Sequence, residues 1–192
     1  MTATLLPDPV GQFGHVSRAV AAALECDPAY DGEWPPETTA QAIRSGEVNL
    51  NAVLFTAAGS GPHPTVLLLH GLPGNEQNLD CGQAIRRAGW NVLTVHYRGS
   101  WGGPGTFSFA NCLEDAASAL RWLQSETPSG NPRVDPARIV LIGHSMGGFV
   151  AAHTAAANPD VLGTSLISGV DLGSAFGKGS NTDTAVVDEN VG

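Results

Sequence analysis

A glycine-flanked serine between a strand pattern and a helix pattern constrains this chain most. Residues 143–148 read Gly-His-Ser-Met-Gly-Gly; they follow the apolar run 139–142 and open a stretch of small residues at 146–157. In this context G-x-S-x-G predicts a sharp strand-to-helix turn, with the serine in a strained conformation and its hydroxyl exposed above the sheet edge. Glycines are needed because a Cβ there would strike a neighbouring element. The pattern predicts Ser145 as a nucleophile; the alternative is a glycine-rich turn without a catalytic role.

The rest of the chain alternates strand-like and helix-like segments. Short apolar or alternating runs predict strands at residues 48–55, 65–70, 91–97, 138–143 and 161–168. Helical spacing predicts helices at residues 75–88, 107–124 and 146–157. Alternation with short connections predicts an α/β fold, in which helices cover both faces of a mostly parallel sheet that begins with an antiparallel strand.

Composition predicts three segments. Residues 1–45 are interrupted by prolines and hold one short helical stretch, so we expect a partly ordered N-terminal arm. Residues 46–171 carry the strand and helix patterns and form the predicted core. Residues 172–192 turn to Gly, Ser, Asn and Asp, which predicts a flexible tail or the start of a cap.

Charge and hydropathy exclude several partners. The formal net charge is −9 and Lys178 is the sole lysine, so a basic patch for nucleic acid cannot be assembled. The apolar run at 19–24 is far shorter than the roughly 20 residues that a bilayer requires. The opening residues lack a basic segment before an apolar one, as a secretory signal would need, so a cytoplasmic protein without membrane contact is predicted.

The cysteines indicate neither a disulfide framework nor a metal site. They are odd in number and widely spaced, at Cys26, Cys81 and Cys112. We therefore expect free thiols and no metal.

A second motif follows the first buried strand. Residues 70–74 read His-Gly-Leu-Pro-Gly. A tetrahedral intermediate of acyl transfer needs two N–H donors aimed at its oxyanion. The backbone N–H groups of Met146 and Leu72 are the predicted donors; the alternative for residues 70–74 is an ordinary tight strand-to-helix turn.

These motifs resemble those of the α/β-hydrolase superfamily, in particular its serine esterase, dienelactone-hydrolase and prolyl-oligopeptidase-like branches. The resemblance covers about residues 48–171, the N-terminal two-thirds of such a domain. It is carried by residues 70–75, 96–105 and 143–148. It implies hydrolysis of an ester, thioester or amide of a small-molecule acyl substrate through an acyl-enzyme at Ser145, with no cofactor. The residues expected to line the pocket are His70, Gly71, His144 and Tyr97.

The catalytic histidine of that resemblance has no counterpart in the expected place. In this family the chain order is serine, acid, histidine. The sole histidine after Ser145 is His153, eight residues on and about two helical turns away. Asp171 follows the last predicted strand and is the candidate acid; a helix cap or a solvated loop residue is the alternative.

Two explanations fit the missing base. The first is a hydrolase truncated at its C-terminus, weakly active or inactive as written. The second is a complete protein that has lost catalysis and serves as a binding or scaffold module. We favour truncation, because a scaffold would not need the preserved motifs. The loss of terminal strands would leave a sheet edge unpaired and predicts self-association there.

Overall fold

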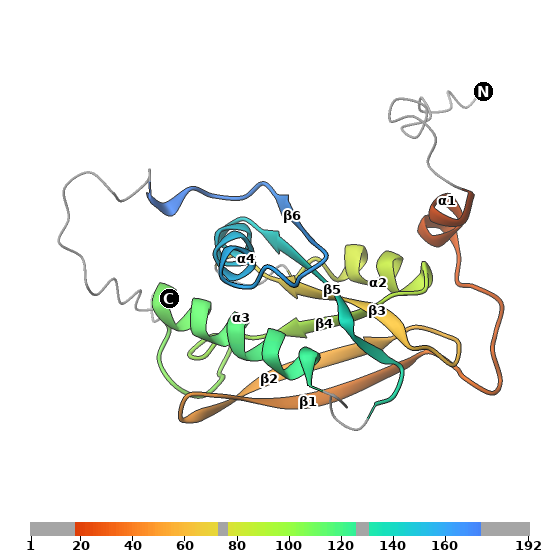
Figure 1. Cartoon of the computed structure of the whole chain (residues 1–192), viewed down its shortest axis with the longest axis horizontal. Coiled ribbons are helices and arrows are strands. Elements are labelled where there is room, and N and C mark those ends of the chain that lie inside the picture. Colours follow the sequence, from red (N-terminus) through yellow and green to blue (C-terminus); the bar gives the residue numbers. More distant parts are fainter. Residues whose placement is uncertain (1–17, 73–76, 126–130, 174–192) are drawn as a thin grey trace, which may run out of the picture.

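One mixed sheet of six strands forms the centre of the protein (Figure 1). The computed structural model describes residues 18–72, 77–125 and 131–173. The strands are β1 Glu37–Ser45, β2 Val48–Thr56, β3 His63–Leu69, β4 Asn91–Val95, β5 Val134–His144 and β6 Gly163–Ile167. Their order across the sheet is β1-β2-β4-β3-β5-β6. β2 is antiparallel to both of its neighbours, β1 and β4, and the remaining neighbouring strands are parallel, which confirms the predicted fold class.

Helices cover both faces of the sheet. They are α1 Arg18–Glu25, α2 Leu79–Arg87, α3 Phe109–Gln124 and α4 Met146–Ala157. Successive side chains of a strand point to opposite faces. Leu67 and Leu69 of β3 accordingly join the large core under α3 and α4, whereas Val66 and Leu68 join a smaller cluster with Ile85 of α2.

The antiparallel hairpin β1–β2 corrects the predicted domain boundary at residue 45. That boundary falls between the two strands, yet they pair along their whole length, from Glu37 opposite Thr56 to Ser45 opposite Val48. The sheet therefore begins at Glu37 rather than after residue 45. The strand β1 was not predicted because an edge strand needs few apolar residues. Ile43 is the one large side chain that β1 buries.

The opposite edge, β6, carries no charge. Its five residues are mostly exposed, and Leu166 is 51% exposed. Leu162, which precedes the strand, is 58% exposed. Natural edge strands are usually protected by charges, prolines or bulges. Self-association through this edge stays a prediction.

A buried ion pair holds the chain that leaves β4. Asp115 of α3 is fully buried and accepts hydrogen bonds from the backbone N–H of Arg98 at 2.8 Å and from its Nε at 2.8 Å. The hydroxyl of Ser45 donates to the same carboxylate at 2.7 Å. Because buried charges need such partners, this cluster fixes the residue directly after Tyr97 against β1 and α3.

Candidate active site

Ser145 is the single residue between β5 and α4, and its backbone is strained. Its φ of 53° and ψ of −119° lie outside the regions that L-residues prefer. Its N–H donates to the carbonyl of Ile167 at 2.9 Å, and its own carbonyl accepts from Gly148 at 3.0 Å and Val170 at 3.1 Å. Bonds to β6 and to the segment after it therefore hold the strained conformation.

The glycines around Ser145 are required by close backbone contacts. A Cβ on Gly143 would overlap the carbonyl of Gly147, and one on Gly147 would overlap the carbonyl of Leu69 in β3. A Cβ on Gly148 would lie 2.7 Å from the Cα of Gly169. The turn thus has the sharp geometry that the sequence pattern predicts.

The loop after β3 lies against the serine. A Cβ built on Gly71 would lie 2.9 Å from the Cβ of Ser145 and 3.4 Å from its Oγ. Leu72 is partly buried and packs on the large core, whereas Pro73 and Gly74 lie outside the described residues. The Gly71–Leu72 peptide therefore starts beside the hydroxyl, at the loop for which the sequence predicts an oxyanion donor.

Met146 begins α4 directly after the serine and is 2% exposed. The first N–H groups of a helix have no acceptor within that helix, and the helix dipole favours negative charge beside them. The 12-residue α4 thus presents its N-terminus at Ser145. The ends of the neighbouring strands β3 and β5 and the start of α4 thus bring the loop with Gly71 and Leu72 close to Ser145 and Met146.

Two histidines at the strand ends, His70 and His96, have lowered pKa values. His70 is 3% exposed, its Nδ1 lies 2.8 Å from the carbonyl oxygen of Gly71, and its ring centre is 4.5 Å from that of Tyr97. Burial lowers the pKa of His70 more than the bond to Gly71 raises it. Burial also lowers the pKa of His96, whose Nε2 lies 2.6 Å from the amide nitrogen of Gln77. Tyr97 is fully buried, and burial raises the pKa of its hydroxyl.

No histidine in the described ranges hydrogen-bonds to Ser145 Oγ. His144 precedes the serine, is partly buried, and its Nδ1 is enclosed without a hydrogen-bond partner. His153 is exposed on α4 and packs on Phe149, with ring centres 4.3 Å apart. His63 lies at the opposite end of β3, where its Nε2 contacts the carbonyl of Gly59. Within the described residues, the structure thus brings Ser145 beside the loop after β3 and the start of α4, with no histidine bonded to its hydroxyl.

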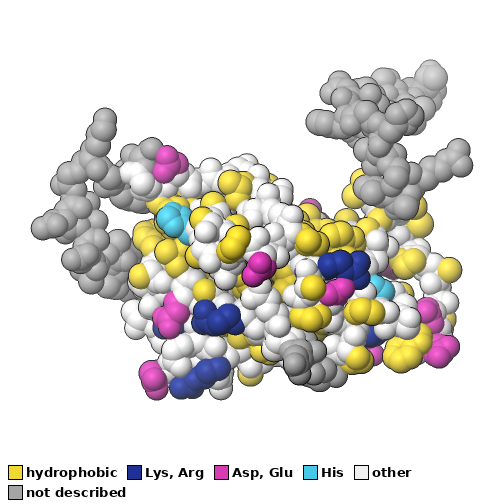
Figure 2. Space-filling view, in the orientation of Figure 1, with side chains coloured by type: hydrophobic (Ala, Val, Ile, Leu, Met, Phe, Trp, Pro, Cys, Tyr) yellow, Lys and Arg dark blue, Asp and Glu magenta, His cyan; other side chains and the backbone are white. Residues whose placement is uncertain are grey.

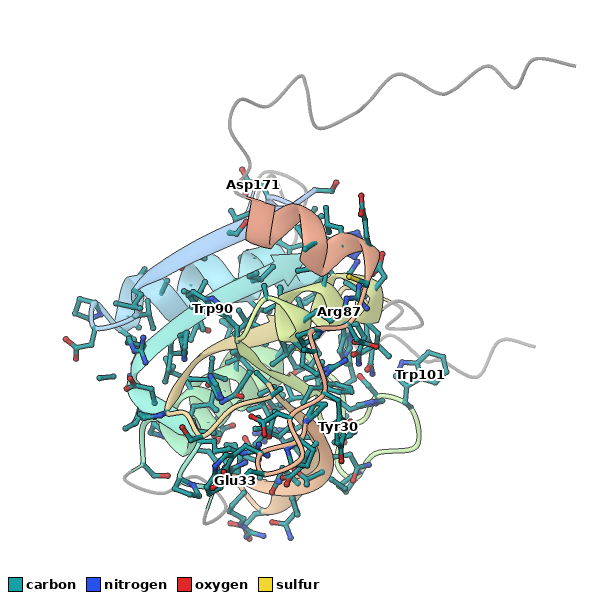
Figure 3. All side chains as sticks on the ribbon, turned by 90° about the vertical axis from the view of Figure 1, so that its right-hand side faces the viewer. Tyr30, Glu33, Arg87, Trp90, Trp101 and Asp171 are labelled. Carbon is teal, nitrogen blue, oxygen red and sulfur yellow. The ribbon has the colours of Figure 1, made fainter. Side chains whose placement is uncertain are left out.

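Asp171 directly follows a residue that is hydrogen-bonded to the backbone of the serine. It is exposed and follows Val170, whose N–H binds the carbonyl of Ser145. Figure 3 shows Asp171 at the top of the molecule, far from Trp101 on the loop after β4. It lines an open groove of 370 Å³ between α4 and β6 that Phe149 and Leu166 also line. On the face shown in Figure 2, hydrophobic side chains gather around a histidine over α4.

The sequence missed the backbone partners of the serine. Nothing in the residue types of Ile167 and Val170 marks them, because they act through backbone groups that every residue carries. Gly71 left a weak signal, as a glycine directly after a buried strand indicates a close approach of the backbone.

Two further findings concern only the part of the chain that the structure describes. No group of three or more His, Cys, Asp or Glu side chains there is arranged to hold a metal ion. None of its helices combines the length and the apolar character that crossing a bilayer demands.

The sequence of this chain matches a model of the alpha/beta hydrolase family over residues 66–188, well over half its length. The chain belongs to the alpha/beta hydrolase family. This match includes all three segments that carry the resemblance, residues 70–75, 96–105 and 143–148.

Among relatives, an uncharacterized protein of Mycobacterium tuberculosis is 38% identical over 105 residues, which are 54% of this chain and 35% of that protein. The sn-1-specific diacylglycerol lipase ABHD11 of Danio rerio is 32% identical over 117 residues, 60% of this chain and 33% of the lipase. The matched region thus spans about a third of the length of these relatives.

Solved structures share the fold. The thermophilic carboxylesterase EstE1, cloned from a metagenomic library, superposes with a TM-score of 0.61 at 24% identity, covering 79% of this chain and 51% of the esterase. Esterase Est22 superposes with a TM-score of 0.59 at 17% identity, covering 82% and 48%. At these identities the likeness supports the fold alone.

Proposed function

We propose that this protein is a serine hydrolase whose nucleophile is Ser145, and that it cleaves an ester, thioester or amide through an acyl-enzyme. The observation that carries the proposal is the position of Ser145. Its strained turn places the hydroxyl beside both the Gly71–Leu72 peptide and the N-terminus of α4. Strain of this kind persists where the surrounding structure imposes it, and it is concentrated at functional sites.

The proposed reaction has two steps. Ser145 Oγ attacks the substrate carbonyl and loses its proton to a base, and the N–H groups of Met146 and Leu72 stabilise the resulting oxyanion. The intermediate collapses, the leaving alcohol, thiol or amine takes a proton, and an acyl-serine remains. Water then attacks the acyl-serine, which releases the acid and regenerates the hydroxyl.

The base and the acid decide how active this chain is. Asp171 is the proposed acid, on the strength of its place after β6 and next to a residue bound to Ser145. No described histidine is in place to take the Ser145 proton, so we expect slow turnover or none. An enzyme that lacks a triad member still keeps part of its rate acceleration from oxyanion stabilisation and binding.

Oxygen esters are the substrate class to test first. The relatives and structural neighbours with named activities include a diacylglycerol lipase and a carboxylesterase. Specificity depends on the residues that line the pocket rather than on the fold, so these names set the choice of probe and not the natural substrate.

The test compares wild type with Ser145→Ala. We expect a fluorophosphonate probe to label the wild type at Ser145, and p-nitrophenyl acetate turnover to drop to background in the variant. Folded wild-type protein that resists the probe, or equal turnover by the two proteins, would reject Ser145-dependent catalysis.

The second candidate is a non-catalytic binding or scaffold protein with this fold. The observation that favours it is that no histidine within the described residues is hydrogen-bonded to Ser145 Oγ. This candidate predicts a stable monomer that does not react with the fluorophosphonate probe. Size-exclusion chromatography and thermal melting, combined with the probe, separate the two candidates.

A further inference from the structure

We infer that His70 is a positioning residue, which orients the Gly71–Leu72 peptide so that the Leu72 N–H serves the oxyanion. This inference deepens the proposed function and rests on it. It assigns His70 a specific atom and a specific bond, beyond its expected place in the lining of the pocket.

The bond itself defines the state of the ring. His70 Nδ1 lies 2.8 Å from the carbonyl oxygen of Gly71. A carbonyl oxygen can accept a hydrogen bond and cannot donate one, so Nδ1 carries the proton. In the neutral ring, Nε2 is then unprotonated. Nε2 is buried and has no hydrogen-bond partner within the described residues. The ring is therefore placed by one polar bond and by its packing on Tyr97.

The consequence follows from the planarity of the peptide bond. The carbonyl of Gly71 and the N–H of Leu72 belong to one trans peptide and point in opposite directions. Holding the carbonyl at the His70 ring fixes the N–H away from that ring. The Cα at which this peptide starts is next to Ser145, as the clash of a Cβ on Gly71 with the serine shows.

The hydrogen bond from His70 is needed because the peptide that it holds starts at a glycine, Gly71. Gly71 must lack a Cβ to let Ser145 approach, and a glycine places little restriction on the rotation of the peptide that follows it. A flip of that peptide would present a carbonyl oxygen, rather than an N–H, to the developing negative charge. The hydrogen bond from His70 opposes this flip.

The test uses substitutions that separate the two ring nitrogens. Asparagine places an amide N–H where Nδ1 lies, glutamine places it near the position of Nε2, and phenylalanine fills the space without a donor. We expect His70→Phe and His70→Gln to lower kcat for p-nitrophenyl acetate about 100-fold, the usual effect of losing one oxyanion donor, with KM nearly unchanged. His70→Asn should restore most of kcat, and His153→Asn, at an exposed histidine on α4, should match wild type. A loss in His70→Asn as large as in His70→Phe, or no loss in any variant, would overturn the inference.

A spectroscopic measurement keeps the inference testable if the chain does not turn over esters. Nitrogen-15 NMR should show His70 as the neutral tautomer protonated at Nδ1. The carbonyl carbon of Gly71 should shift in His70→Phe and return towards its wild-type position in His70→Asn. If wild type and Ser145→Ala are equally inactive but these signals behave as expected, the proposed function fails and the positioning stands. An Nε2-protonated ring, or a Gly71 carbonyl that does not respond, overturns the positioning whatever the activity.

Discussion

The two loops that meet at Ser145 are built on different principles. In the turn at residues 143–148, glycines pack backbone against backbone, and three hydrogen bonds hold the serine to β6, to α4 and to the segment after β6. The loop at residues 70–72 has one glycine against the serine and one side-chain hydrogen bond, from His70.

This difference between the two loops suggests which of them supports the stability of the fold and which supports the chemistry. Backbone packing is part of the core, so a change in the turn has to move β3, β5 or α4. A side-chain hydrogen bond at the pocket edge can be lost while the sheet remains. We therefore expect changes in the turn to act mainly on stability and changes in the loop to act mainly on chemistry.

The largest effect is expected from Gly147→Ala. Its new Cβ would overlap the Leu69 carbonyl and lie 2.7 Å from the carbonyl of His70, so strand and helix must separate. Overpacking of this kind costs about 3 kcal/mol of unfolding free energy or more. Urea denaturation should show this loss.

Gly82→Ala is the matched control, because a Cβ there makes ordinary contacts of 3.5 Å with Leu68 and 3.6 Å with Val92. Alanine is a better helix former than glycine, so this variant should be as stable as wild type or gain about 1 kcal/mol. Equal losses of stability in the two variants would show that the turn at Ser145 is no more sensitive to an added methyl group than a helix elsewhere in the protein.

Gly71→Ala should act on the serine more than on the fold. The added methyl would lie 2.9 Å from Ser145 Cβ and 3.0 Å from the carbonyl of His144. We expect labelling of Ser145 by a fluorophosphonate to slow about 100-fold, because a small misplacement near the reacting atoms has that effect. The stability loss should be about 2 kcal/mol, smaller than for Gly147→Ala.

A double mutant sharpens this comparison. In Gly71→Ala combined with Ser145→Gly, the Cβ that clashes with the new methyl is gone, so part of the stability loss should be recovered. Contacting residues typically couple by about 0.5–3 kcal/mol in such cycles. Strict additivity would show that the loop does not rest on the serine side chain.

Ser145→Gly should stabilise the protein while removing the nucleophile. A non-glycine residue in this strained conformation costs on the order of 1–3 kcal/mol, and glycine relieves much of that cost. Because the unfolded chain also gains freedom, we expect a net gain of about 1 kcal/mol. Ser145→Ala keeps its Cβ and should show no gain; a gain equal to that of Ser145→Gly would disprove backbone strain as the cause.

The smallest effect is a loss of stability in mild acid. Burial lowers the pKa of both His70 and His96 below the ordinary value of 6.5. The folded state therefore binds fewer protons than the unfolded state, and this contribution is complete above pH 6.5 and is lost as the pH falls towards the lowered values. Urea midpoints should drop between pH 7.5 and pH 5.5, and the drop should shrink in His70→Asn and His96→Asn. An unchanged slope in both variants would assign the pH dependence to other groups.

The sequence predicted the elements whose signals are local. The apolar runs of β3 to β5 and the small-residue pattern of α4 can be recognised within short segments, so the alternation of strand and helix was predicted. The family resemblance followed from three short segments, residues 70–75, 96–105 and 143–148. The strand β1 was missed because its edge position buries one large side chain, Ile43, and leaves its polar pattern like that of a loop. The helix α2 begins at Leu79, later than the predicted start at residue 75.

By itself, the sequence determined that a serine sits in a turn where glycines are required, because a missing Cβ can be read directly from the residue type. The tertiary structure decided what surrounds that serine. It brought Gly71 against the hydroxyl, bound the serine backbone to Ile167 and Val170, and left His153 two turns away on the outside of α4. These contacts depend on backbone groups common to all residues and on the order of strands across the sheet, and neither is encoded in any short stretch of the chain.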